Sequence, residues 1–332
     1  MYSFFNFFYV KLISYDRFFM KFIKVNNLHF ILILVFVLSA CSNNDDILQE
    51  DPDKEVPIDN LSKGKGLFRY IYNETNFTKT INIYYYIPVN KTSTTPIVFV
   101  FHGNGRNAKD YRNAMIAKAD EFGFIAIVPE FSEQNFPGGD GYNLGNVFID
   151  GDNPSPSSLN SEEEWTFSLI EPIFNSVKSN INNTTSKYHM IGHSAGAQFA
   201  HRFAMFEPNA RFDKVVVSAA GWYTVPDETI NFPYGFKESP LENRNLLDLF
   251  SKNIIIQVGE LDNNPNSSGL RHNQFADSQG LNRYKRANYF FNNAHTIAQN
   301  NTLSFAWKLY INEGLDHSFQ PALEKAADLL FN

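Results

Sequence analysis

The chain has 332 residues, of which 43% are hydrophobic and 19% are charged, and its formal net charge is -7. This length and apolar content are sufficient for a large folded domain with its own core. The negative balance, together with the lack of a basic stripe in the sequence, argues against a nucleic-acid-binding protein.

The N-terminal segment has the pattern of a secretory signal. Residues 28–40 form an apolar run behind Lys21 and Lys24, the usual order of a positive and a hydrophobic segment in a signal peptide. The run is too short for a comfortable membrane span. It ends in Leu-Ser-Ala-Cys, which resembles a bacterial lipobox. We therefore expect Cys41 to be acylated and to become the mature N-terminus.

A polar, acidic segment without an apolar period follows Cys41 and is typical of a flexible tether. Cys41 is the only cysteine, so no intramolecular disulfide can form. The sequence leaves open whether translation starts at Met1 or at Met20. The chain divides into a signal at 1–40, a lipidated tether at 41–65 and a folded domain at 66–332. We expect the protein to lie in the bacterial cell envelope, anchored at the outer membrane, with the lipid as its sole membrane contact.

Beyond residue 66, short apolar runs alternate with helical patterns. The runs lack polar faces, so they suit strands of a sheet that is covered on both sides. Alternation at this spacing predicts an α/β fold with a mostly parallel central sheet and helices on both faces. The expected strands are 67–72, 80–87, 96–101, 124–128, 188–191, 214–218, 253–258 and 304–311, the first two forming a hairpin. The expected helices are 108–122, 162–179, 195–206, 280–298 and 321–331.

Three long connections interrupt this rhythm, at 130–161, 221–249 and 262–279. Loops of this length in a compact domain are usually functional. Each follows a strand, so we expect all three at the carboxyl edge of the sheet, where ligands bind in open α/β folds.

The strongest chemical signal is Gly-His-Ser-Ala-Gly at 192–196. It lies directly after an expected strand and directly before an expected helix, which is the context of a nucleophile elbow. Side chains in place of the two glycines would crowd the adjoining strand or helix. We predict that Ser194 is a catalytic nucleophile exposed near a helix N-terminus, where developing negative charge is favoured.

A second signal is His-Gly-Asn-Gly at 102–105, at the end of an apolar strand. This sequence is typical of a loop that supplies half of an oxyanion hole. We expect the backbone N–H groups of Asn104 and Ala195 to be the two donors. We expect His102 to brace the loop rather than to react.

A serine nucleophile needs a base, and the base needs an orienting acid. Among the histidines after Ser194, His317 follows the last apolar strand and precedes the final helix, which favours it as the base. Asp262 heads the loop after the penultimate strand, and we predict that it is the acid. Glu260, two residues earlier, remains the alternative. Asp316 is disfavoured because neighbours in sequence seldom present side chains to each other.

From residue 67 to the C-terminus, the chain resembles an α/β-hydrolase. The elbow with Gln198, Phe199, His201 and Arg202, and the later Ala-Ala-Gly-Trp-Tyr at 219–223, are similar to secreted bacterial esterases of the polyhydroxybutyrate-depolymerase and feruloyl-esterase-like group. The resemblance implies ester hydrolysis without a cofactor, and it leaves the substrate open because this fold hosts many chemistries. The chain lacks the cysteine pair found in some members of that group.

The sequence therefore predicts a lipid-anchored serine hydrolase that cleaves carboxylic esters, either small or polymer-linked. The aromatic residues of the three long connections stand among polar neighbours, which favours short-acyl or aryl esters, possibly on polysaccharide, over long-chain lipids. A peptidase of the same fold and a catalytically silent glycan-binding lipoprotein are the alternatives. No cofactor and no metal are expected, and Asp140, Asp150 and Asp152 are interpreted as a solvated acidic loop rather than a calcium site.

Overall fold

A computed structural model of the protein describes residues 54–75 and 77–332. The expected signal and Cys41 lie outside the described residues. Within the described residues, no helix combines the length and the hydrophobicity that crossing a membrane requires.

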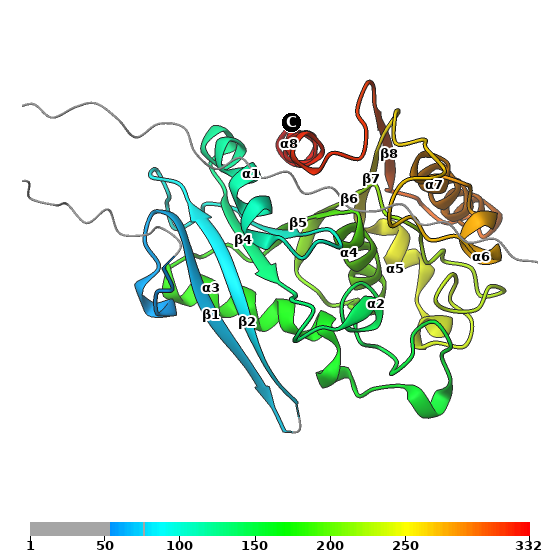
Figure 1. The fold of residues 1–332 in the computed structure, drawn as a ribbon, viewed down its shortest axis with the longest axis horizontal. Helices are drawn as coiled ribbons and strands as arrows, with labels where there is room; N and C mark the ends of the chain where they lie inside the picture. The colour runs from blue at the N-terminus through cyan, green and yellow to red at the C-terminus, as the bar shows by residue number, and fades with distance from the viewer. Residues whose placement is uncertain (1–53, 76) are drawn as a thin grey trace, which may run out of the picture. The chain divides into compact units, whose positions relative to one another are not determined.

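A single eight-stranded sheet forms the centre of the domain (Figure 1). Its strand order is β1-β2-β4-β3-β5-β6-β7-β8; β1 and β2 form an antiparallel hairpin, β2 pairs antiparallel with β4, and the remaining pairs are parallel. The strands are β1 (Gly64–Glu74), β2 (Phe77–Ile87), β3 (Ile97–Phe101), β4 (Ile125–Glu130), β5 (Tyr188–His193), β6 (Phe212–Ser218), β7 (Asn253–Gly259) and β8 (Lys308–Asn312). The predicted mostly parallel sheet with a leading hairpin is confirmed.

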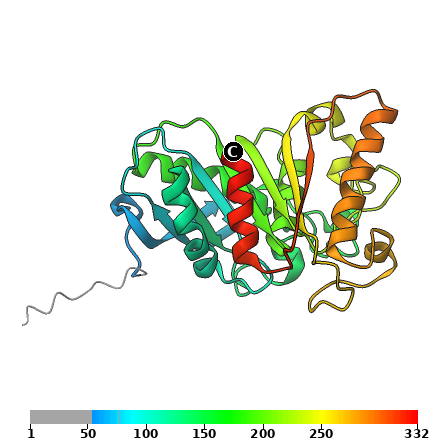
Figure 2. The same cartoon turned by 90° about the horizontal axis from the view of Figure 1, so that it is seen from above.

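Helices cover both faces of this sheet. The principal helices are α1 (Ala108–Phe122), α3 (Ile170–Asn180), α4 (Ala195–Phe206), α5 (Leu246–Ser251), α7 (Arg283–Asn300) and α8 (Phe319–Phe331). Helices α1 and α8 lie side by side across one face (Figure 2), and α3, α4, α5 and α7 pack on the other. The short helices are α2 (Gly138–Gly141) and α6 (Gln274–Ser278), with 3₁₀ turns at 58–60, 156–158, 162–164, 166–169 and 240–243.

The central strands divide their side chains between two cores. In β6, Val215 and Val217 join the larger core beneath α3, α4, α5 and α7, while Val216 joins the smaller core beneath α1 and α8. All three valines are fully buried. This alternation follows from the two-residue period of a strand, and it explains why both faces of the predicted strands are apolar.

One expected helix is shorter than predicted. The pattern at 162–179 forms two 3₁₀ turns before α3 begins at Ile170. The Thr166 hydroxyl donates to the carbonyl of Gly141 at 2.7 Å, and the Trp165 indole donates to the carbonyl of Asn160 at 3.1 Å. These bonds to other parts of the chain replace the regular helical pattern in this segment.

The packed chain also begins earlier than residue 66. Val56, Ile58 and Leu61 pack against the larger core, and β1 begins at Gly64. The described part of the expected tether therefore contributes contacts to the domain.

Candidate active site

Ser194 occupies a sharp turn between β5 and α4. Its backbone has φ 56° and ψ -115°, a conformation that is costly for a residue with a side chain. A Cβ on Gly192 would lie 2.1 Å from the carbonyl oxygen of Gly196, and a Cβ on Gly196 would lie 2.1 Å from that of Phe101 in β3. Glycine is therefore required on both sides of the serine, as the sequence pattern predicted.

The structure brings Ser194, His317 and Asp262 together from three separate elements. His317 lies between β8 and α8, and Asp262 follows β7. The Ser194 Oγ lies 3.1 Å from Nε2 of His317, and Nδ1 of His317 lies 2.6 Å from Oδ2 of Asp262. This geometry suits a hydroxyl that donates to an imidazole whose other nitrogen donates to a carboxylate.

The close approach of β7 to the histidine loop depends on a glycine. A Cβ on Gly259 would lie 2.1 Å from the carbonyl oxygen of Leu315. The N–H of Leu261 then donates to that same carbonyl at 2.9 Å. These contacts bring the segment that carries Asp262 alongside the segment that carries His317.

The acidic neighbours of the two segments have other partners. Asp262 is 3% exposed, and its second oxygen, Oδ1, lies 3.4 Å from Nη1 of the buried Arg283. Glu260 is exposed and accepts from the backbone N–H of Gly314 at 3.2 Å. Asp316 accepts from the backbone N–H of Ser318. Of the three carboxylates, Asp262 alone is hydrogen-bonded to the imidazole of His317.

Asn104 and Ala195 line the same cavity as Ser194. Ala195 is the first residue of α4, where backbone N–H groups lack partners within the helix and the helix dipole favours negative charge. The backbone at Gly103 passes close to the serine, because a Cβ there would lie 3.6 Å from that of Ser194. The arrangement is suitable for two backbone donors on either side of the serine hydroxyl.

His102 is fully buried and braces the loop that carries Asn104. Its Nε2 accepts from the backbone N–H of Phe131 at 3.1 Å, and its Nδ1 donates to the carbonyl of Gly103 at 3.0 Å. Burial lowers the pKa of His102 to about 4, so the imidazole is neutral at neutral pH. The Tyr142 hydroxyl donates to the carbonyl of His102 and supports the same loop.

Comparison with known proteins places this architecture among solved hydrolases. Poly(aspartic acid) hydrolase-1 from Sphingomonas sp. KT-1 is 34% identical over 82% of this chain and all of its own, with a TM-score of 0.75. The poly(3-hydroxybutyrate) depolymerase LpqC from Bordetella parapertussis is 29% identical over 81% of this chain and 90% of its own, with the same TM-score. No family model and no curated protein matches the chain.

The chain belongs to the α/β-hydrolase superfamily. Within it, the chain falls in the polyhydroxybutyrate-depolymerase-like group, and it is a hydrolase. A siderophore hydrolase from Aspergillus nidulans, 14% identical over 82% of this chain and 95% of its own with a TM-score of 0.50, shares the fold.

The cavity next to the elbow of this α/β-hydrolase is small, with a volume of about 190 Å³. Trp222, Arg271 and Arg283 line it together with Ser194. Sequence reasoning missed both arginines because no motif links them to the elbow. The guanidiniums of Arg202 and Arg271 pack on the ring of Trp222, at 4.2 and 4.8 Å from its centroid.

The other aromatic residues expected at a pocket divide between pocket and core. Tyr223 is fully buried and stacks on Phe290, with centroids 4.4 Å apart. Phe136 and Tyr142 are also core residues, so these three aromatic side chains pack inside the domain rather than at a pocket. Their polar sequence neighbours did not reveal that the side chains turn inward. Trp222, Phe232 and Tyr234 do line cavities.

The three aspartates of the acidic loop bind separate partners. Asp140 accepts from the N–H of Gly151, Asp150 accepts from Asn153, and Asp152 pairs with Arg271. Within residues 54–75 and 77–332, no cluster of three His, Cys, Asp or Glu side chains is arranged to hold a metal ion.

Proposed function

We propose that this hydrolase cleaves carboxylic esters with Ser194 as its nucleophile, His317 as its base and Asp262 as the residue that orients His317. The observation that carries the proposal is the hydrogen-bonded chain from Ser194 Oγ through His317 to the buried Asp262. This set of groups has no purpose in a silent binding protein, which disfavours the glycan-binding alternative.

The reaction follows from the positions of these groups. Ser194 Oγ bonds to the ester carbonyl carbon while its proton moves to Nε2 of His317. The bond to the alcohol oxygen then breaks, and His317 gives that oxygen the proton. Water repeats the sequence on the acyl-serine, releasing the acid and restoring the hydroxyl. The N–H groups of Asn104 and Ala195 stabilise each oxyanion, and losing one such donor typically costs about 3 kcal/mol.

We infer that the acyl group is short. The cavity beside Ser194 has a volume of about 190 Å³, below the roughly 300–1,000 Å³ of sites that enclose drug-sized ligands. Trp222 and the polar side chains of Asn143 and Gln198 line it, rather than long aliphatic chains. On acyl esters of increasing length, kcat/KM should be highest for acetyl and propionyl esters. A maximum at long chains would contradict this inference.

The test of the mechanism is Ser194→Ala. The wild type should hydrolyse 4-nitrophenyl acetate and react with a fluorophosphonate probe at Ser194, because the elbow presents an activated hydroxyl. The variant should lose nearly all turnover and all labelling. Ser251→Ala, which removes an exposed serine of α5, is the matched control and should keep both. Full turnover in Ser194→Ala would refute the proposed role.

A second candidate is hydrolysis of a polyanionic amide. It is favoured by the 34% identity to a poly(aspartic acid) hydrolase and by Arg271 and Arg283 in the cavity wall. Release of soluble fragments from poly(aspartic acid), with kcat/KM above that on small esters, would favour this candidate. Because amide hydrolysis would use the same serine, Ser194→Ala does not distinguish it from ester hydrolysis, and the comparison of substrates does.

We further propose that Cys41 carries a lipid and holds the hydrolase at the outer membrane of a bacterial envelope. The support is the apolar run at 28–40 that ends in Leu-Ser-Ala-Cys. The full chain should partition with membranes and carry acyl groups at Cys41 by mass spectrometry. Cys41→Ala should abolish acylation, and an unmodified Cys41 in the mature protein would contradict the anchor.

A further inference from the structure

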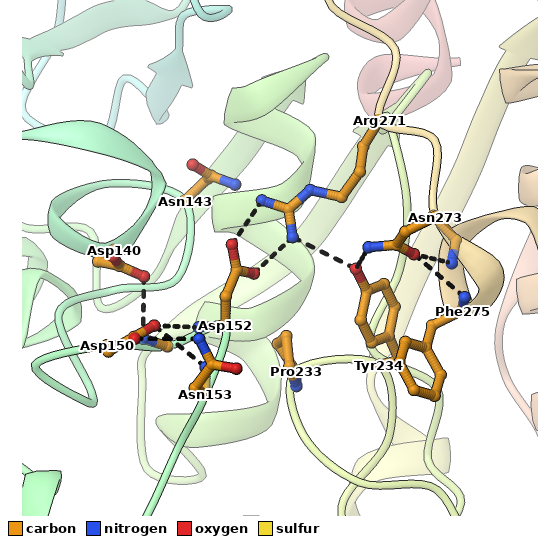
Figure 3. Close-up of polar contacts among 12 residues, drawn as sticks. Asp140, Asn143, Asp150, Asp152, Asn153, Pro233, Tyr234, Arg271, Asn273 and Phe275 are labelled. Carbon is orange, nitrogen blue, oxygen red and sulfur yellow. Dashed lines mark hydrogen bonds and ion pairs between the residues drawn. The ribbon is translucent and has the colours of Figure 1, made fainter.

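A larger cavity, of about 620 Å³, lies beside the catalytic one and has no role in the reaction described above. All three long connections contribute to its wall, although they are far apart in the sequence (Figure 3). The first supplies Asp152, Asn153 and Pro154, the second Asn231, Phe232, Pro233, Tyr234 and Glu238, and the third Arg271, Asn273 and Phe275. Its volume lies within the usual range for a binding site of an organic ligand.

Arg271 links this cavity to the catalytic one, because it lines both. Its guanidinium forms a two-point pair with the carboxylate of Asp152, with Nη2 3.0 Å from Oδ2 (Figure 3). It also packs on Trp222, whose ring lies 4.7 Å from that of Tyr234. The two cavities are therefore neighbours with Arg271 in the wall of each.

An aromatic surface forms one side of the larger cavity. Phe275 is 51% exposed, and its ring stacks on that of Tyr234 with centroids 5.3 Å apart and planes 25° apart. The Tyr234 hydroxyl accepts from Asn273 at 2.7 Å and from Arg271 at 3.3 Å, which fixes the ring beneath Phe275. The third connection thus holds an exposed aromatic ring on a rigid support next to the cavity.

The rest of the wall combines apolar and polar residues and carries no excess positive charge. Its apolar part is Phe232, Pro154 and Pro233, and its charged groups are Asp152, Glu238 and Arg271. Asp152 pairs with Arg271, whereas Glu238 accepts from the amide of Asn231. A polyanion is disfavoured by this balance. A long acyl chain is disfavoured because the wall contains no Leu, Ile, Val or Met side chain, and its apolar surface consists of aromatic rings and two prolines. Carboxylates and amides suit hydroxyl groups, and an exposed aromatic face suits the apolar side of a sugar ring.

We propose that this cavity binds a neutral sugar unit belonging to the alcohol part of the ester, with Phe275 as the residue on which the sugar stacks. The inference rests on the proposed ester hydrolysis and assigns the substrate class: short-acyl esters of a saccharide. Ser194 then cleaves the acyl group that projects from the bound sugar into the small cavity.

The test compares two substrates in the full-length enzyme, an O-acetylated xylo-oligosaccharide and 4-nitrophenyl acetate. Phe275→Ala should lower kcat/KM for the oligosaccharide by roughly tenfold, which is about 1.4 kcal/mol, because the sugar loses the ring on which it stacks. It should leave kcat/KM for 4-nitrophenyl acetate unchanged, since that ester does not reach the larger cavity. Leu247→Ala, at an exposed apolar residue of α5, is the control and should alter neither value.

A binding measurement tests the sugar site independently of the proposed ester hydrolysis. Ser194→Ala should bind the unacetylated xylo-oligosaccharide in calorimetry, and adding Phe275→Ala should weaken that binding by a similar factor. If the wild type cleaves no ester, ester hydrolysis fails while this readout still tests the site. Equal losses on both substrates, an unaffected oligosaccharide, or weakened binding of poly(aspartic acid) in place of the sugar would each overturn the inference.

Discussion

The two carboxylates after β7 show how surroundings separate residues of similar chemistry. Asp262 is buried against Arg283 and hydrogen-bonded to His317, whereas Glu260 faces solvent and bonds the backbone of Gly314. A buried carboxylate with two cationic or hydrogen-bonding partners holds an imidazole in one tautomer more firmly than an exposed one does. Glu260, two positions nearer the strand, therefore holds the backbone of the loop at Gly314, and Asp262 contacts the histidine.

Asp262→Asn should lower kcat by up to ~10⁴, because the amide favours the wrong tautomer of His317. Glu260→Gln should cost less than tenfold, since it alters only a contact at the surface. Steady-state kinetics on 4-nitrophenyl acetate, with circular dichroism to verify folding, makes the comparison. The reverse ranking would assign the acid to Glu260.

Chain order and local motifs were sufficient to propose Ser194, His317 and Asp262 as a catalytic set from the sequence, because each follows a recognisable strand. Arg271 and Phe275 could not be found in this way. The partner of Arg271 is Asp152, 119 residues away, and no spacing rule connects loops that meet only after folding. The exposure of Phe275 likewise depends on how Tyr234 packs beneath it.

Among the elements, the β5–α4 turn is tightly constrained by its neighbours. Gly196 lies against the backbone of β3, and Gly192 lies against the first turn of α4. Backbone atoms cannot move aside as a flexible side chain can, so added volume must shift a whole element. The turn thereby fixes the position of the serine relative to the loop at Asn104.

Gly196→Ala should destabilise the protein by roughly 1–3 kcal/mol or more and abolish most activity, because its Cβ would collide with β3. Gly105→Ala is a matched change in the neighbouring loop, where the closest atom to the new Cβ is 3.4 Å away. It should fold and melt as the wild type does. Thermal denaturation of both variants measures the difference in melting temperature. Equal melting temperatures would contradict the prediction, because they would mean that β3 shifts to accommodate the new Cβ at little cost in stability.

The strands and most helices followed from the sequence, but their starts did not always do so, since the strand expected at 304–311 begins at Lys308. Asn282 ends the previous loop and caps α7, with its side chain accepting from the N–H of Lys285 at 2.9 Å. The predicted start at residue 280 was therefore too early. For α3 the error was larger, since the bonds of Thr166 to Gly141 and of Trp165 to Asn160 override a local helical pattern.

For the whole molecule, Glu207 at the C-terminal end of α4 makes the free energy of unfolding depend on pH. Burial, followed by the charges of Glu162 and Glu171, raises the pKa of Glu207 from 4.5 to about 7. The folded state thus binds this proton more tightly than the unfolded chain does. Its contribution is fully present below about pH 4.5 and is lost as the pH rises through about 7.

Glu207→Gln should remove this dependence. The melting temperature of the variant should exceed that of the wild type at pH 8 and fall closer to it at pH 5, because the neutral side chain never becomes a charged group in the half-buried site. Calorimetry across pH 5–8 measures the two profiles. Glu313→Gln, at an exposed position, is the control, and parallel profiles for Glu207→Gln and the wild type would contradict the assignment.

The position of the proposed base, His317, between β8 and α8 separates it in the chain from the nucleophile elbow. The elbow is translated before His317, and His317 follows β8, which pairs with β7 in the finished sheet. A nascent or prematurely terminated chain therefore carries a serine without its base. The proposed catalytic set is therefore assembled only when β8 has joined the sheet.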